Sequence, residues 1–152
     1  SARAVVMGLN NLNIKKITII GRNENSLDIF IESMRNLLSK NNILIEGINH
    51  TKINVSQYIE EADLIINTTS FGMMAGEKIN LDKKNLTKNT LIFDIIYEPR
   101  QTEFLKDFSR EGYQTFNGIG MLIRQAATAF NFWFEKNEIS NHDVKVIQKI
   151  LK

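Results

Sequence analysis

The sequence predicts an α/β fold in which a doubly wound parallel sheet is covered by helices on both faces. Two observations support this fold class. Four short apolar runs, at residues 15–20, 43–48, 63–67 and 91–96, are continuous rather than alternating, as expected of strands buried on both sides. Segments with the helical spacing of apolar residues lie between these runs, and strands that alternate with helices favour a parallel sheet.

The first part of the chain predicts a strand, a helix and a second strand. Residues 15–20 have the sequence KKITII and stop at Gly21, which is typical of a buried strand that ends in a loop. Apolar residues then recur every three or four positions, which predicts an amphipathic helix over 27–39 with Ser26 as its N-cap. The run 43–48 predicts the second strand, and apolar residues at 55–59 indicate a short helix.

The rest of the chain continues the alternation. We expect strands at about 63–67 and 91–96, helices at 102–111, 118–134 and 140–151, and a short extended element at 115–116. The polar stretch 76–90 is expected to be a surface excursion between two strands. Because no repeat, low-complexity tract or linker divides residues 1–152, we expect one domain.

Composition argues against several classes of protein. The 152 residues contain no cysteine and only two histidines, His50 and His142, so a dedicated transition-metal site is not expected. A formal net charge of +2 is too small to require a nucleic acid or a membrane as partner. The apolar runs are far shorter than the roughly 20 residues of a membrane span, and we expect a cytoplasmic protein.

The beginning of the chain has the pattern of a helix, because Ala2, Val5, Val6 and Leu9 have helical spacing. In a Rossmann-like nucleotide-binding unit, a strand and a glycine-rich turn stand before such a helix, and pyrophosphate binds at the helix N-terminus. We therefore expect the first strand and the glycine loop of the sheet to be absent from this chain.

Gly21, Arg22 and Asn23 come directly after the strand at 15–20. In a dinucleotide-binding unit, an acidic residue at this position accepts hydrogen bonds from the adenosine ribose. This chain has Arg22 instead, whose guanidinium can hold a 2′-phosphate by charge-assisted hydrogen bonds, and this favours NADP over NAD. Taken alone, Arg22 fits a solvated loop arginine better than a phosphate ligand.

A run of small hydroxyl residues, Asn67-Thr68-Thr69-Ser70, precedes Phe71-Gly72-Met73 at the end of the strand at 63–67. Ligands of open α/β sheets bind at the carboxyl ends of the strands, where hydroxyl groups and exposed backbone can meet ribose and phosphate oxygens. The alternative interpretation is a turn selected for local hydrogen bonds between side chains and backbone.

The strand at 91–96 leads into Tyr97, Glu98 and Pro99, the only proline of the chain. Proline fixes its own φ and keeps the preceding residue out of the helical region, so the strand is expected to end abruptly. Tyr97 would then lie at the same edge of the sheet as the 67–73 turn. A half-buried tyrosine with a satisfied hydroxyl is the alternative interpretation.

Two glycines, Gly118 and Gly120, precede a helix that carries Met121 and Gln125 one turn apart on one face. Glycine permits close approach of the backbone to another group. The alternative is an ordinary junction between loop and helix, with Met121 in the core and Gln125 in solvent.

Together, and in this order, these segments resemble the C-terminal cofactor-binding domain of the shikimate dehydrogenase family. The resemblance covers about residues 1–134. NTTSFGM resembles the family's N-[AT]-T-S-x-G-[MI] turn, DIIYEPRQTEFL its D-x-x-Y-x-P-x-x-T-x-[FL]-L segment, and NGIGMLIRQAATAF its [DN]-G-x-G-M-L-x-x-Q helix start. The beginning SARAVV is similar to the segment that comes after the family's G-A-G-G phosphate loop.

The resemblance implies an NADP-binding domain and assigns residues to the cofactor. Those residues are Ser1, Gly21, Arg22, Asn23, Thr69, Ser70, Ile95, Gly118 and Met121. Ser1 falls at the end of the phosphate loop, and Arg22 and Asn23 lie at the 2′-phosphate. By the same resemblance, Thr69 and Ser70 lie at the ribose and phosphate. Ile95, Gly118 and Met121 border the nicotinamide. The family usually has Asn-Arg-Thr at 21–23, so this chain keeps the guanidinium but changes both of its neighbours.

The resemblance also implies the reaction, the reversible NADPH-dependent reduction of 3-dehydroshikimate to shikimate. Tyr97 and Gln125 would contact the substrate, Gln125 by a side-chain hydrogen bond to a ring hydroxyl. The family's catalytic lysine and aspartate lie in an N-terminal substrate domain that matches nothing in this chain. We therefore expect no catalytic residue and no metal ligand here, and an inactive chain on its own.

Two other functions remain possible from the sequence. One is a paralogue that acts on quinate, and the other is a non-catalytic nucleotide-binding or assembly module. The absent first strand is central in the family's usual strand order, so its loss would divide the sheet and expose two strand edges. A homodimer that covers these edges is therefore also an expectation.

Overall fold

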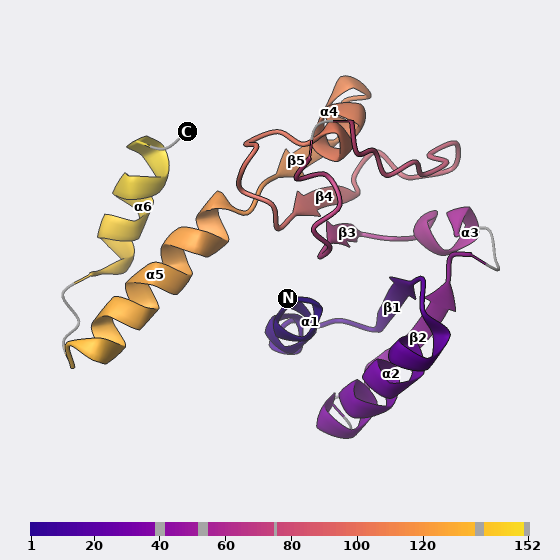
Figure 1. Cartoon of the computed structure of the whole chain (residues 1–152), viewed down its shortest axis with the longest axis horizontal. Coiled ribbons are helices and arrows are strands. Elements are labelled where there is room, and N and C mark those ends of the chain that lie inside the picture. Colours follow the sequence, from indigo (N-terminus) through magenta and orange to yellow (C-terminus); the bar gives the residue numbers. More distant parts are fainter. Residues whose placement is uncertain (39–41, 52–54, 75, 136–138, 151–152) are drawn as a thin grey trace. The chain divides into compact units, whose positions relative to one another are not determined.

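A computed structural model describes residues 1–38, 42–51, 55–74, 76–135 and 139–150 (Figure 1). The chain divides into two compact units, which are considered one at a time. The first unit comprises Ser1–Ala62 and Leu81–Thr87, and the second comprises Asp63–Asn80 and Lys88–Lys152. Both contain parallel strands with helices packed against them, and the described strands form two separate sheets. A divided sheet is what the sequence analysis expected.

The first unit is built on two parallel strands, β1 (Lys16–Gly21) and β2 (Leu44–Asn49), paired from Lys16 with Leu44 to Gly21 with Asn49. Helix α2 (Glu24–Leu38) connects them and packs on one face, while α1 (Ala2–Leu9) adds Val6 to the same core. A short helix, α3 (Ser56–Ile59), comes after β2. The buried core consists of Val6, Ile17, Leu27, Ile31, Met34, Leu38 and Ile45.

Helix α2 begins three residues earlier than predicted. The side-chain oxygen of Asn23, not Ser26, caps the helix, because Asn23 Oδ1 accepts a hydrogen bond from the Ser26 backbone N–H at 2.9 Å. The Ser26 N–H would otherwise be one of the unsatisfied donors of the first turn. Both residue types are good N-caps, so the sequence alone did not distinguish them. The predicted end of this helix, residue 39, lies outside the described residues.

The second unit contains three parallel strands in the order β3 (Leu64–Asn67), β4 (Leu91–Asp94) and β5 (Gln114–Phe116). Helix α4 (Glu103–Arg110) connects β4 to β5 and buries Phe104, Leu105 and Phe108. The rings of Phe104 and Phe108 meet edge to face at 5.1 Å, and Tyr113 meets Phe108 in the same way at 5.3 Å. These aromatic contacts hold α4 against the start of β5.

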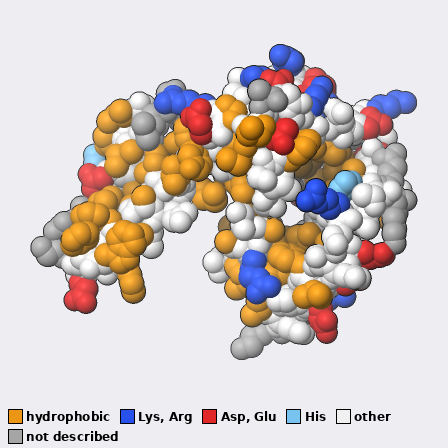
Figure 2. Space-filling view, viewed as in Figure 1, with side chains coloured by type: hydrophobic (Ala, Val, Ile, Leu, Met, Phe, Trp, Pro, Cys, Tyr) orange, Lys and Arg blue, Asp and Glu red, His pale blue; other side chains and the backbone are white. Residues whose placement is uncertain are grey.

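Helices α5 (Ile119–Trp133) and α6 (Asn141–Ile150) pack on each other through Ile123, Ala127 and Val144. The Asn131 side chain fastens the segment between them, because its amide donates to Ile139 O at 2.9 Å and accepts from Ile139 N at 3.0 Å. Phe132 and Trp133 are largely exposed, and Figure 2 shows hydrophobic side chains gathered over these two helices.

The predicted elements are present, and most of their ends differ from the predictions by one to three residues. The strand expected at 91–96 ends at Asp94, whose carboxylate accepts a hydrogen bond from the Ile96 backbone N–H. The element expected at 115–116 begins at Gln114, and α4 is one residue shorter than predicted at each end. Residues 76–90 contain neither helix nor strand, and residue 151, the predicted end of the last helix, lies outside the described residues. No described helix is long and apolar enough to cross a membrane.

Met34 is the test of the first unit's core. Its side chain is completely buried in the cluster that α2 forms with the β1–β2 sheet, whereas Ile29 on the same helix is 69% exposed. We expect Met34→Ala to lower the free energy of unfolding by about 2–5 kcal/mol because it leaves a cavity. Ile29→Ala is the matched control and is expected to change it by less than about 0.5 kcal/mol. Urea titration of the chain measures both, and equal losses would contradict this core.

Candidate functional site

A buried carboxylate joins the ends of two neighbouring strands in the second unit. Asp94 ends β4 and has no exposed surface, and Asn67 ends β3 and is also buried. The Asn67 amide donates to Asp94 Oδ1 at 3.1 Å, and the Thr102 hydroxyl donates to Asp94 Oδ2 at 2.7 Å. We call these three residues the Asp94 network. It connects β3, β4 and the N-terminus of α4.

Neutral donors satisfy both oxygens of the Asp94 carboxylate. In addition to the Asn67 amide, Oδ1 accepts from the Ile96 backbone N–H at 3.1 Å, and Oδ2 accepts from the Thr102 hydroxyl. Burial raises the pKa of Asp94 above its ordinary value, and the hydrogen bonds from Thr102, Ile96 and Asn67 oppose that rise. Thr102 also caps α4, since its hydroxyl oxygen accepts from Leu105 N at 3.3 Å.

The side-chain oxygen of Asn67 holds the turn after β3. Asn67 Oδ1 accepts from the Thr69 backbone N–H at 3.0 Å and from the Thr69 hydroxyl at 2.8 Å. Thr69 Oγ1 in turn accepts from Phe71 N at 3.1 Å. The only hydroxyl hydrogen of Thr69 is therefore used inside the turn, and Thr69 offers a ligand just its remaining lone pair. Ser70 is exposed at the tip.

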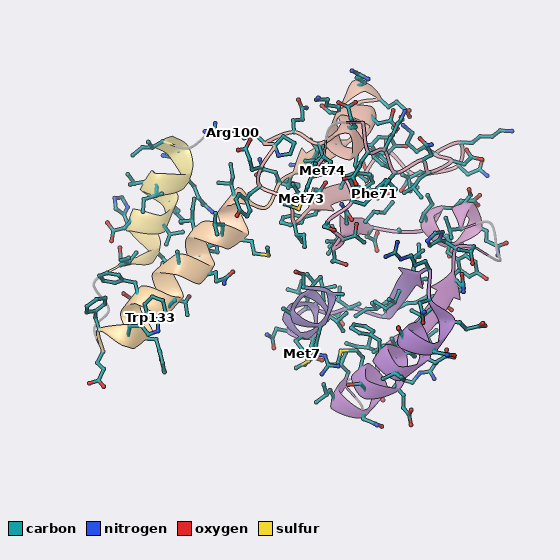
Figure 3. The ribbon with its side chains drawn as sticks, in the orientation of Figure 1. Met7, Phe71, Met73, Met74, Arg100 and Trp133 are labelled. Atoms are coloured by element: carbon teal, nitrogen blue, oxygen red, sulfur yellow. The ribbon has the colours of Figure 1, made fainter. Side chains whose placement is uncertain are left out.

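A second carboxylate holds the far side of this turn. Glu77 Oε2 accepts from the backbone N–H of Gly72 at 2.8 Å and of Met74 at 3.1 Å, and these hydrogen bonds lower the pKa of Glu77. Gly72 has a φ of +112°, which favours glycine. Figure 3 shows Phe71, Met73 and Met74 grouped in the turn, where all three are exposed.

The segments after β4 and β5 meet at Gly118. Its N–H donates to Ile96 O at 3.0 Å, and a Cβ on Gly118 would lie 1.9 Å from the Ile95 carbonyl oxygen. Only glycine allows this contact, because no side-chain carbon approaches a backbone oxygen so closely. Asn117 reinforces it, since its amide donates to Arg100 O at 2.9 Å across the loop that contains the cis Glu98–Pro99 bond.

The second unit thus brings several predicted site residues to one edge. Thr69 and Ser70 lie beyond β3, Ile95 and Tyr97 beyond β4, and Gly118 beyond β5, all at the carboxyl ends of adjacent parallel strands. Tyr97 is 48% exposed rather than packed in the core. Met121 and Gln125 lie one turn apart on α5, and both are exposed, so Met121 is not the core residue of the alternative interpretation.

The remaining predicted residues, Ser1, Gly21, Arg22 and Asn23, belong to the first unit. Ser1 is exposed at the start of α1, and Arg22 is exposed just after β1. A Cβ on Gly21 would touch Leu27 at 3.4 Å, so this glycine also fits the packing of α2. Asn23 gives its side-chain oxygen to the helix cap, and its amide N–H groups are the donors that it can offer to a phosphate.

Sequence reasoning missed three residues that organise the site: Asp94, Thr102 and Glu77. Asp94 and Thr102 were visible only as letters of the matched motif, and Glu77 lies in a stretch interpreted as a surface excursion. A charged residue at the end of an otherwise apolar strand is a usable signal, because burial of an acid requires partners. Within the described residues, no three His, Cys, Asp or Glu side chains are grouped as a metal would require.

Comparison with known proteins confirms the resemblance drawn from the motifs. A shikimate dehydrogenase (NADP(+)) of Prochlorococcus marinus strain MIT 9515 is 41% identical over 145 residues, which cover 91% of this chain and 49% of that protein. One of Methanococcus aeolicus is 37% identical over 135 residues, covering 88% of this chain and 46% of that protein. The chain spans about half the length of the curated relatives it matches, and no family model matches it.

Solved structures confirm the Rossmann-like fold class. A shikimate 5-dehydrogenase of Listeria monocytogenes, crystallised with shikimate and NAD, aligns with 99% of this chain and 52% of that chain, with a TM-score of 0.78 and 26% identity. A 5-ketofructose reductase of Gluconobacter sp. strain CHM43 aligns with 98% of this chain and 52% of that chain, with a TM-score of 0.73 and 25% identity.

The buried position of Asp94 predicts a pH dependence of stability. Its pKa is raised on folding, so the folded state binds more protons than the unfolded state, and this group makes stability fall as pH rises through the carboxyl range. We expect the free energy of unfolding of the wild type, relative to Asp94→Asn, to decrease as the pH rises past the ordinary aspartate pKa of about 3.9. The exposed carboxylates with lowered pKa act in the opposite direction but are common to both proteins. A difference that grows with pH would contradict the assignment.

The contact at Gly118 predicts a large difference between two neighbouring glycines. Gly118→Ala must move either α5 or the Ile95 carbonyl, and we expect a loss of about 1–3 kcal/mol in the free energy of unfolding. Gly120→Ala is the control, because its Cβ would meet only the flexible end of Gln148, and alanine favours a helix. Chemical denaturation of both variants measures the difference, and equal stability would show that Gly118 is not constrained.

Proposed function

We propose that this chain is the NADP-binding part of a shikimate dehydrogenase, which reversibly reduces 3-dehydroshikimate to shikimate with NADPH. The curated relatives carry this name, and they align with nearly the whole chain. The chain spans about half the length of these relatives. We therefore assign the dehydrogenase activity to a protein that contains a substrate domain in addition to these residues. We expect the chain alone to be inactive.

The observation that carries the proposal is the edge formed by β3, β4 and β5. Ligands in open parallel sheets bind outside the carboxyl ends of the strands, and Ser70, Tyr97 and Gly118 lie just beyond three adjacent strand ends. The Asp94 network fixes two of these ends relative to each other. A cofactor placed there would meet a preorganised backbone rather than mobile loops.

The residues at this edge fit a nicotinamide cofactor. Gly118 has no side chain and lies against the Ile95 carbonyl, so it leaves backbone and the partly buried Ile95 to border a flat ring. In the first unit, the exposed guanidinium of Arg22 and the amide of Asn23 offer donors to a 2′-phosphate. This donor set supports NADP as the cofactor.

The division of labour is derived from these positions. When bound, the cofactor supplies the hydride that passes between its C4 and the carbonyl carbon of the substrate. Tyr97 and Gln125 are exposed, and a phenol and an amide can hydrogen-bond to ring hydroxyls and orient that carbon. We assign no proton donor in this chain, and the proton on the substrate oxygen is assigned to the catalytic lysine and aspartate of the substrate domain.

A second substrate class has one observation in its favour. The 5-ketofructose reductase shares the fold of this chain at a TM-score of 0.73, so the same cofactor half accompanies substrates other than shikimate. Quinate, which differs from shikimate within the ring, is the rival that sequence analysis left open. The non-catalytic module is disfavoured because the three site motifs are all present.

Location and assembly complete the proposal. A biosynthetic NADPH-dependent reduction takes place where that cofactor is kept reduced, and we assign the protein to the cytoplasm. We also propose that this chain on its own forms a homodimer, which is supported by the unpaired edges that two small sheets present among the described strands. Neither assignment requires a nucleic acid or a membrane.

The test is steady-state kinetics on the full-length protein encoded by the gene. We expect shikimate oxidation with NADP⁺ in preference to NAD⁺, and a Gln125→Ala variant whose KM for shikimate rises about five- to tenfold while its KM for NADP⁺ is unchanged. Gln114→Ala is the matched control, since Gln114 is an exposed glutamine at the amino end of β5 and should leave both constants unchanged.

Two results would overturn the proposal. Oxidation of quinate but not shikimate would assign the protein to the rival substrate. No oxidation of either compound, together with no heat of binding for NADP⁺ or NAD⁺ in calorimetry, would favour the module.

A further inference from the structure

The feature from which we infer more is the carboxyl end of the β1–β2 sheet. The last paired residues are Gly21 and Asn49, and the next hydrogen bond runs from the His50 backbone N–H to Gly21 O at 3.1 Å. The ladder therefore continues to His50. One step further in the same register, Arg22 stands opposite His50, on strands whose backbones are about 5 Å apart.

The backbone on both sides of His50 is fixed. Asn49 Oδ1 accepts from the Thr51 N–H at 2.9 Å and from the Thr51 hydroxyl at 2.6 Å, which closes a local turn around His50. Arg22 and His50 are both exposed. The position of His50 is therefore set by the strand end and by this turn.

The groups offered at this edge are donors. Arg22 has five N–H groups and no acceptor, and the imidazole of His50 donates at least one N–H and carries positive charge when protonated. The acceptor atom of Asn23 is turned into the cap of α2 by its bond to Ser26 N. Glu24, the acidic residue nearest in sequence, opens α2 and already has an interaction within the chain.

We infer that His50 is a further ligand, beside Arg22 and Asn23, for the 2′-phosphate of NADP, and that it helps select NADP over NAD. The inference rests on the proposed function and adds a residue that the motifs did not include. Two adjacent donors on parallel strand ends can contact different oxygens of one phosphate. The 2′-hydroxyl of NAD has a single uncharged oxygen and cannot accept both of these charge-assisted hydrogen bonds. His50 thereby replaces part of what the changed neighbours of Arg22 no longer supply.

The test uses two small probes and the full-length protein. Adenosine 2′,5′-bisphosphate carries the 2′-phosphate, and 5′-AMP lacks it, so their affinities measured by calorimetry isolate that group without any catalytic readout. We expect His50→Ala to weaken the bisphosphate about five- to tenfold and to leave 5′-AMP unchanged. His50→Lys should retain most of the affinity, because it restores a donor with positive charge.

His142→Ala is the matched control, since His142 is exposed on α6 and is the only other histidine. It should leave both probes unchanged, and thermal unfolding should show that His50→Ala is folded. Equal weakening of both probes by His50→Ala would overturn the inference by placing His50 at the base or ribose. No weakening would overturn it too, while a loss confined to Arg22→Ala would leave the proposed function standing. If the wild type binds both probes equally, the NADP assignment itself fails.

Discussion

The buried carboxylate of Asp94 is the constraint on which the second unit depends. An ionised acid without solvent is costly unless donors surround it, and here the donors come from β3, from the backbone after β4 and from the cap of α4. Each donor is consequently held where the carboxylate needs it. The strand ends that carry the exposed site residues are therefore positioned by a buried group with no surface of its own to offer a ligand.

Local patterns were sufficient to predict the elements. Continuous apolar runs placed β1, β2, β3 and β4, and helical spacing placed α2, α4, α5 and α6, because these elements bury residues at fixed intervals along the chain. Element ends were less predictable. Asn23 and Ser26 are both suitable N-caps, and which of them caps α2 depends on the residue at which β1 ends.

The contacts that shape the site could not be predicted in the same way. Asp94 meets Asn67 across 27 positions and Thr102 across eight, so no sequence period contains them. The motif resemblance nevertheless identified the segments that meet at this edge. A family motif contains the residues that make such long-range contacts, but it does not say which residues contact each other. It did not reveal which residues hold the turn and which face a ligand. Thr69 belongs largely to the first group.

Asn23 caps α2, and its proposed second use as a donor to the 2′-phosphate bears on how cofactor preference could change in this fold. The residue must keep a side-chain oxygen for Ser26, or the Ser26 backbone N–H loses its capping acceptor. Aspartate meets that requirement and also favours the positive end of the helix, yet it exchanges the amide nitrogen for a second acceptor. Such an acceptor would repel a phosphate and attract ribose hydroxyls. In the proposed site, an exchange of this one side-chain atom would favour NAD over NADP while the cap of α2 is kept.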